Sequence, residues 1–236
     1  MKIYFRIVLV FTLFTVGLIN CNAQITINNT LYTTTQLVDG VLVPATSGTV
    51  ISNVTFGGVY NNSGRYQVGY FSTATTTLAQ MGFASGVVLT SGNTSTIPLT
   101  LGADPAATQM ATAYTSCTIG EIRQGGTCPA GINDIDILAG ANNYFNAAVL
   151  EFDFIPVENS VTFRYIFGSE EYNDSSNSAF DINYNCSSYN DKFGFLISGP
   201  GILGGQGYTN NARNIARLAN GSEVSINSVN DGIVGS

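Results

Sequence analysis

Five carboxylates lie in or beside one Asn-rich stretch, and they are the groups best suited to chemistry in a chain without histidine. Hard cations such as Ca²⁺ take six to eight oxygens from carboxylates, amides and backbone carbonyls. The spacing does not match an EF-hand loop, and a solvated loop of turn-forming Asn, Asp and Ser explains the composition equally well. We predict a calcium site, with the solvated loop as the alternative; the candidate ligands are Glu170, Glu171, Asp174, Asp181 and Asp191.

Two of these carboxylates could instead hydrolyse a glycosidic bond, one as acid and the other as nucleophile or base. Glu171 and Asp191 would form that pair. Paired acids on a loop are far more often solvated or bound to a metal, and nucleophiles that need a histidine base are excluded by the composition. The sequence therefore favours a protein that is not an enzyme.

Other polar and aromatic side chains have a simpler interpretation beside the functional one. Asp134 and Asp136 could add cation ligands, but capping of a short helix at Ile135 is favoured. Tyrosines could stack on a sugar, although a place in the core or on a strand surface is favoured; the candidates are Tyr184, Tyr189 and Tyr208.

Alternating stretches on the N-terminal side of these acids predict two strands, residues 150–154 and 161–167. If their apolar faces coincide, Phe154 faces Phe163 and Asp153 faces Arg164. That register requires a two- or four-residue hairpin loop centred after Glu158, and four residues are favoured. Glu170 and Glu171 could then serve one ion only if the second strand has ended before them.

Apolar bursts between Asn, Gly and Ser turns predict further strands at Val50–Phe56, Gln67–Ser72, Gly86–Leu89, 193–197 and Val224–Ile226. Short helices are expected at Thr77–Met81, Pro105–Tyr114 and Ile135–Ala141. No charge run, linker or repeat divides the chain, so residues 24–236 are predicted to form one domain. We expect an all-β fold, an antiparallel, jelly-roll-like β-sandwich with a few short helices.

The N-terminus has the pattern of a secretory signal peptide over residues 1–23. Lys2 and Arg6 precede an apolar run, and small residues allow cleavage after Ala23, although Cys21 leaves a lipoprotein signal as the alternative. Cleavage would change the net charge from −7 to −9 and leave no membrane span. Such acidity argues against nucleic acid and anionic membranes as partners. Gly199–Gly204 is predicted to be a turn rather than a nucleotide site, because no helix pattern follows it.

Three cysteines would remain after cleavage. Cys117 and Cys128 bracket a Gly-rich loop, and an oxidising compartment favours a disulfide between them. Cys186 then has no obvious partner within the sequence, and we expect one beyond Ser236.

Three ordered blocks give the chain a resemblance to a known family. Val149–Pro156, Phe163–Tyr172 and Asn190–Pro200 resemble the bacterial choice-of-anchor L domain, with weaker similarity from Thr34 onward. The resemblance implies a module of exported surface proteins and gives the best support to Glu170, Glu171 and Asp191 as ligands. The chain departs from the family at Asn146, where relatives tend to carry Asp, and we expect it to end inside the domain.

These observations predict a non-catalytic secreted or cell-surface module for adhesion or ligand binding, with calcium as the ion that would order its acidic loop. Its partner would be an extracellular glycan or protein. The alternatives are a structural spacer within a larger surface protein or a carboxylate-based glycoside hydrolase.

Overall fold

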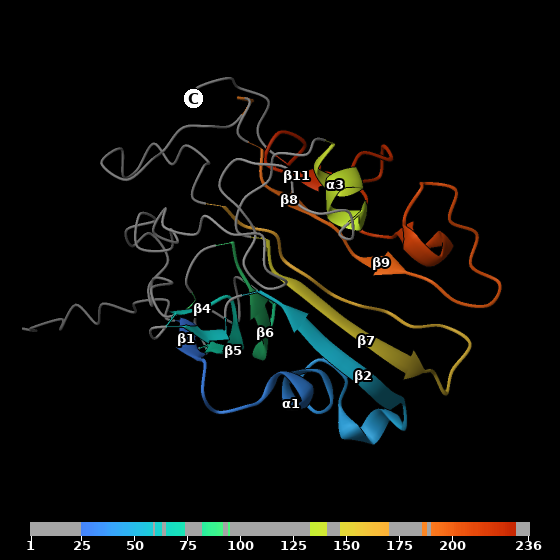
Figure 1. Cartoon of the computed structure of the whole chain (residues 1–236). Helices are drawn as coiled ribbons and strands as arrows, with labels where there is room; N and C mark the ends of the chain where they lie inside the picture. Colours follow the sequence, from blue (N-terminus) through green and yellow to red (C-terminus); the bar gives the residue numbers. More distant parts are fainter. Residues whose placement is uncertain are drawn as a thin grey trace, which may run out of the picture.

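The computed structural model describes residues 25–58, 60–62, 65–73, 82–91, 94, 133–140, 147–169, 186–187 and 190–229. Within these ranges the chain is built mainly of antiparallel strands with a few short helices, so the all-β class is confirmed. No helix in them is long and apolar enough to cross a membrane. Figure 1 shows the pair of β2 (Val50–Gly57) and β7 (Val149–Ile155) between two groups of elements. The first group contains β1 (Ile25–Asn28), β5 (Val68–Thr73) and β6 (Ser85–Leu89), and the second contains β8 (Lys192–Phe193), β9 (Leu196–Ile197) and α3 (Asn133–Ala139).

The first group is a three-stranded sheet with a short ribbon. β5 (Val68–Thr73) lies between β1 (Ile25–Asn28) and β6 (Ser85–Leu89) and is antiparallel to both. The ribbon pairs β3 (Tyr60–Asn62) with β4 (Arg65–Tyr66). The sequence predicted β5 and β6 from their apolar residues, and both are confirmed.

Helix α1 (Thr34–Val38) covers this sheet and β2. It begins with a capping box, in which Thr33 Oγ1 accepts from Gln36 N at 3.2 Å and Gln36 Oε1 accepts from Thr33 N at 3.0 Å. The box satisfies two backbone donors that a helix start would otherwise leave without partners. Leu37 and Val38 are buried, so this short helix is held by packing as well as by its cap.

β2 (Val50–Gly57) and β7 (Val149–Ile155) form an antiparallel pair in which Ile51 lies opposite Phe154. The register shifts between Ser52 and Thr55, where Asn53 has a φ of 51°. A bulge of this kind bends a strand locally. Along β7 the even-numbered residues are partly buried and the odd-numbered residues from Glu151 to Ile155 are exposed. The half-buried strand predicted here is confirmed.

The second group contains α3 (Asn133–Ala139), which contacts β8. β8 (Lys192–Phe193) pairs antiparallel with β11 (Val224–Ser225). β9 (Leu196–Ile197) pairs antiparallel with β10 (Arg213–Asn214). Two 3-10 helices, Ala45–Ser47 and Thr209–Asn211, complete the described elements. The buried side chains of this group include Tyr208, Ala216, Val224 and Ile226.

The strand predicted over residues 193–197 is divided in two. Between β8 and β9, Phe195 N donates to Asn214 Oδ1 at 3.1 Å, so a side chain takes the place of a ladder partner. α3 packs against this point: a Cβ at Gly194 would lie 2.7 Å from Leu138 Cδ2, too close for any side chain to fit without movement. The division therefore coincides with the close approach of α3.

Several predictions lie outside the described residues: the signal peptide, both ends of the Cys117–Cys128 disulfide, the helices at Thr77–Met81 and Pro105–Tyr114, and Tyr184 and Tyr189. The single domain and the jelly-roll order of strands stay predictions. The turn at Gly199 is confirmed, since Ile202 N donates to Gly199 O at 3.1 Å and Gly201 has a φ of 82°.

Candidate functional site at the base of the acidic segment

Residues 156–169 follow β7, turn back and run beside it (Figure 1). The rings of Phe154 and Phe163 meet edge to face with centroids 6.4 Å apart, so the predicted facing pair is in contact. Residues 161–168 nevertheless form no strand, and β7 pairs with β2 instead. The predicted second strand of the hairpin is wrong as a hydrogen-bonded strand, although its aromatic register is retained. We call residues 161–169 the return segment.

The predicted pair of Asp153 and Arg164 is also wrong. Asp153 Oδ2 accepts a hydrogen bond of 2.6 Å from Asn53 Nδ2, across the bulge of β2. Arg164 reaches the first group of strands, where Nη2 donates to Gly82 O at 3.1 Å and the guanidinium lies 4.5 Å from the centroid of the Phe83 ring. Each side chain thus finds a partner outside the hairpin, and Arg164 ties the return segment to the residues before β6.

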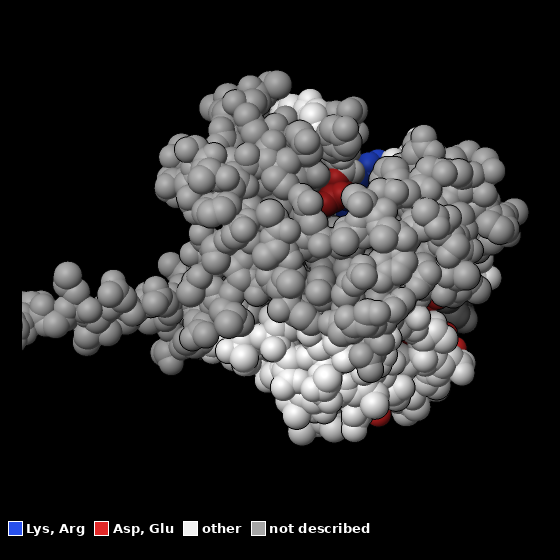
Figure 2. All heavy atoms as spheres, turned by 60° about the vertical axis from the view of Figure 1, so that its left-hand side comes forward, with Lys and Arg blue, Asp and Glu red and all other residues white. Residues whose placement is uncertain are grey.

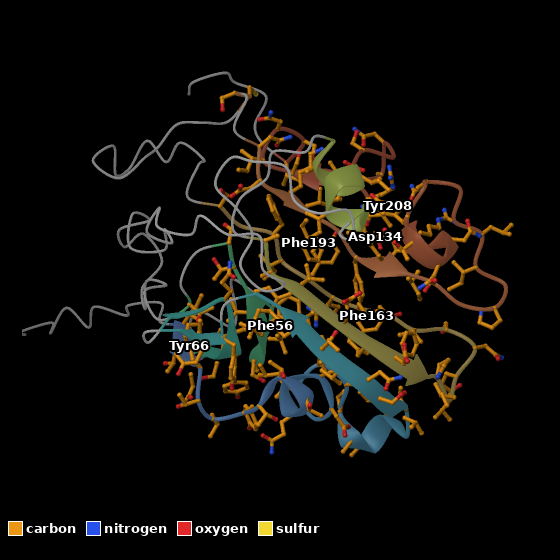
Figure 3. The ribbon with its side chains drawn as sticks, viewed as in Figure 1. Phe56, Tyr66, Asp134, Phe163, Phe193 and Tyr208 are labelled. Atoms are coloured by element: carbon orange, nitrogen blue, oxygen red, sulfur yellow. The ribbon has the colours of Figure 1, made fainter. Side chains whose placement is uncertain are left out.

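Aromatic contacts on the other side join the return segment to β8 and the residues before β9. Phe163 and Phe195 have ring centroids 4.6 Å apart, and Tyr165 and Phe193 have centroids 4.9 Å apart. From the first pair to the second, the return segment advances from residue 163 to 165 while its neighbour goes back from residue 195 to 193. This is the spacing of antiparallel neighbours on one face. Figure 3 shows Phe163 and Phe193 between β7 and the group of strands around β8 and β9.

We call residues 170–190, which contain the Asn-rich stretch, the acidic segment. The residues at its C-terminal end are held by residues that follow β11. Ile226 N donates to Asp191 O at 3.1 Å, and the Ile226 side chain is fully buried. Asn227 N donates to Asn190 Oδ1 at 3.0 Å, and Asn227 Nδ2 donates to Ser187 O at 2.9 Å. The backbone is anchored at these points while Asp191 itself is exposed. Sequence reasoning predicted a strand at Val224–Ile226 but missed this anchoring role.

A group of charges lies next to Asp191 along β8. Glu223 accepts from Lys192 Nζ at 3.4 Å and lies 3.6 Å from Arg217 Nη2. These side chains are partly exposed, so the pairs contribute modestly to stability. Glu223 is shared between two cations, one of which, Lys192, follows Asp191 directly in the sequence.

Tyr208 belongs to the core of this group. The residue is 4 % exposed, and its hydroxyl has no hydrogen-bond partner among the described residues. Burial, and next the negative charge of Glu223, raise the pKa of Tyr208 above its ordinary value. A ring so enclosed cannot stack on a sugar, so the core interpretation is confirmed (Figure 3).

Asp134 has a role other than the two predicted. Its Oδ1 atom accepts a hydrogen bond of 2.6 Å from Thr209 N, the first residue of a 3-10 helix. Asp134 lies in the first turn of α3, so it joins two helices instead of capping the one that contains it. The predicted capping of α3 by Asp134 is therefore corrected. The Asp136 side chain is not among those that the structure describes.

Of the five predicted calcium ligands, Asp191 is the one that lies within the described ranges. Glu170, Glu171, Asp174 and Asp181 lie outside them. Among the described side chains, no three acidic or cysteine groups come together as metal ligands. Calcium binding therefore stays a prediction.

The strands and segments that meet at this site come from the three blocks singled out in the sequence. A family model, the choice-of-anchor L domain, matches residues 26–236. The chain belongs to the choice-of-anchor L domain family. Membership indicates a module of a surface-anchored bacterial protein. Neither a curated protein nor a solved structure gives a match. In this choice-of-anchor L domain, β7, the return segment, β8 and β9 each come from one of the family-like blocks.

Proposed function

We propose that this choice-of-anchor L domain is a non-catalytic ligand-binding module displayed outside the cell, with an acidic segment ordered by calcium. The observation that carries the proposal is the aromatic register of the return segment. Phe163 lies against Phe195 and Tyr165 against Phe193, and continuing the register sets Phe167 opposite Asp191.

This register gives the acidic segment a closed base. The acidic segment follows the return segment in the chain and ends before Asp191, and the register brings the residues on its two sides, Phe167 and Asp191, next to one another. A segment with joined ends loses less entropy when an ion gathers its oxygens. Glu170 and Glu171 would be near one end and Asp191 at the other. Such a set offers the hard oxygen donors that Ca²⁺ prefers.

The neighbouring charges support the same proposal. Glu223 lies 3.4 Å from Lys192 Nζ and so offsets part of the positive charge beside Asp191. The chain as a whole has a net charge of −7, so its long-range field attracts cations. Binding of an ion to the folded state alone raises the apparent stability.

Thermal melts of the protein in 10 mM CaCl₂ and in EDTA test the proposal. Calcium sites of extracellular modules have dissociation constants of about 0.1 to 1 mM, so the ion should stabilise by about 1.4 to 2.7 kcal/mol. For a chain of this size that corresponds to about 3 to 10 °C in the melting temperature. Equal midpoints in the two buffers would sink calcium ordering.

Matched variants separate a specific site from general charge effects. Asp191→Asn should remove more than half of the calcium-dependent shift, because it deletes a ligand at the closed base. Glu158→Gln removes an equal charge from an exposed position in the turn after β7 and should retain the whole shift. Mg²⁺ at the same concentration should have a smaller effect, since it demands a tighter octahedral geometry.

Binding is tested independently of calcium ordering. A screen of the protein against extracellular glycans and matrix proteins should give at least one saturable interaction. A spacer would bind none of them, and that outcome would favour the structural alternative.

A further inference from the structure

One face of the β2–β7 pair is exposed from the Val50–Ile155 end as far as Thr55 and Glu151. We call it the outer face and define it by cross-strand pairs: Val50 with Ile155, Ser52 with Asp153 and Thr55 with Glu151. All six residues are exposed. The opposite face carries Phe154 and the aromatic contacts described above. The sheet pair therefore packs on one side and presents the other to solvent.

The outer face has an apolar end. Val50 is 57 % exposed and Ile155, directly opposite, is 67 % exposed. Val157 is 64 % exposed and lies beside the same end of the face. A Cβ added to Gly48, two residues before Val50, would be 3.3 Å from Val157 Cγ2. Single exposed apolar side chains are ordinary, but neighbouring ones mark a surface that gains by being covered.

Carboxylates flank this apolar end on both sides. Asp153 and Glu151 continue the outer face along β7, and Glu158 follows Val157. Among the described residues no cation lies within ion-pair distance of these three groups. In Figure 2 acidic atoms border the described lower part of the molecule. The face thus combines uncovered apolar surface with uncompensated negative charge.

We infer that the outer face binds an extended segment of a partner protein in which every second residue faces this surface, and in which those facing residues are basic and apolar in turn. Side chains two residues apart on one side of a strand are about 6.5 Å apart, and the same spacing separates Asp153 from Ile155. Lysine or arginine would meet the carboxylates while the apolar side chains cover Val50 and Ile155. This inference deepens the proposed ligand-binding function and rests on it.

The charges argue against two other occupants. A second copy of the chain would bring its own carboxylates against those on either side of the apolar end, and like charges repel. An anionic bilayer would be repelled for the same reason. A basic partner instead gains from every flanking group, in both encounter rate and specificity.

Fluorescence anisotropy with synthetic peptides tests the inference on the whole protein. The probe, called the Lys–Val peptide, is a labelled twelve-residue peptide that repeats Lys-Ser-Val-Ser, so that Lys and Val share one face of the extended chain. The controls repeat Glu-Ser-Val-Ser (the Glu–Val peptide) and Lys-Ser-Ser-Ser (the Lys–Ser peptide). The Lys–Val peptide should bind at least about tenfold more tightly than either control, because both charge and apolar contact contribute. Its binding should weaken as salt rises, since exposed charges are screened.

Variants assign the binding to the outer face. Ile155→Ser should weaken Lys–Val binding by about fivefold or more, and Glu151→Gln with Asp153→Asn should weaken it and flatten its salt dependence. Leu203→Ser, at a side chain 81 % exposed in another part of the molecule, should bind like the parent. All these positions are exposed, so the variants should fold, and their melting temperatures verify it.

Three outcomes would overturn the inference. Parent-like binding by the Ile155→Ser protein places the site elsewhere, while leaving a ligand-binding function in place. Binding to phosphatidylcholine vesicles without binding to the Lys–Val peptide identifies a lipid surface. A dimer in sedimentation that Ile155→Ser converts to a monomer identifies a second copy. The calcium-dependent melt is a separate measurement. A failure of calcium ordering is therefore distinguishable from a failure of peptide binding at the outer face.

Discussion

Removal of the Phe163 ring should lower the free energy of unfolding, and the size of the loss depends on the contacts that the ring makes. Phe163 is partly buried between Phe154, at 6.4 Å, and Phe195, at 4.6 Å. Truncation of a fully buried Phe to Ala costs about 3 to 5 kcal/mol, and about half of this is expected for a partly buried ring. Phe163→Ala should therefore lower the free energy of unfolding by about 2 kcal/mol. Urea denaturation followed by circular dichroism measures the change.

Control variants separate ring contacts from general effects of substitution. Leu203→Ala, at a position 81 % exposed, should change the free energy of unfolding by less than about 0.5 kcal/mol. Phe163→Leu keeps most of the apolar volume and should fall between the parent and the alanine variant. If Phe163→Ala were no more destabilising than Leu203→Ala, the packing of the return segment against β7 would be refuted.

Double-mutant cycles test the register itself. Aromatic pairs in contact couple by about 0.5 to 1.5 kcal/mol, while residues without contact are additive within about 0.5 kcal/mol. Phe163 should couple to Phe195 and not to Phe193, which contacts Tyr165 instead. Equal coupling of Phe163 to both would refute the register, and with it the closed base of the acidic segment.

Two further predictions concern a buried hydroxyl and a bridging cation. Tyr208→Phe should raise the free energy of unfolding by about 1 kcal/mol at pH 7, because the buried hydroxyl lacks a partner among the described residues. Because burial raises the pKa of Tyr208, ionisation of its hydroxyl disfavours the folded state, so the parent should lose further stability relative to Tyr208→Phe as the pH rises above about 10. Melts of parent and Tyr208→Phe between pH 8 and 11 should diverge at the alkaline end; parallel curves would contradict the shift. Arg164→Lys should cost about 0.5 to 1 kcal/mol in urea denaturation, since lysine lacks the planar group that lies on Phe83 and donates to Gly82. Arg213→Lys, at an exposed position in β10, is the matched control, and an equal effect there would count against the bridge.

Alternation in the sequence predicted which face of a strand is buried more reliably than which strand is its neighbour. The pattern of residues 150–154 predicted β7 and its inward aromatics, and both are present. The same pattern is satisfied by any partner with a matching apolar face, and β2 offers one through Ile51 and Phe56. The contact of Phe154 with Phe163 could be predicted because both belong to the buried face. The ladder partner could not, because it depends on residues about a hundred positions away.

The sequence predicted only part of the candidate site, because some of its contacts are also made by residues far apart in the chain. Asp191 was identified from its residue type and its place beside a strand, and it lies at the base described above. Its anchoring by Ile226 and Asn227 depends on a segment more than thirty residues further along the chain. Asp134 shows the same limit, since the sequence offered a helix start beside it and gave no sign of Thr209. Local patterns predict local partners, and these side chains have distant ones.

The exposed outer face of β2 and β7 also has an evolutionary consequence. Substitutions at exposed positions usually change stability by less than about 0.5 kcal/mol, whereas the inward aromatics are constrained by their neighbours. The six outer positions can therefore change in charge and size while the fold persists. A displayed module built in this way can acquire a new partner through a few substitutions, and the same positions are suitable for a randomised library.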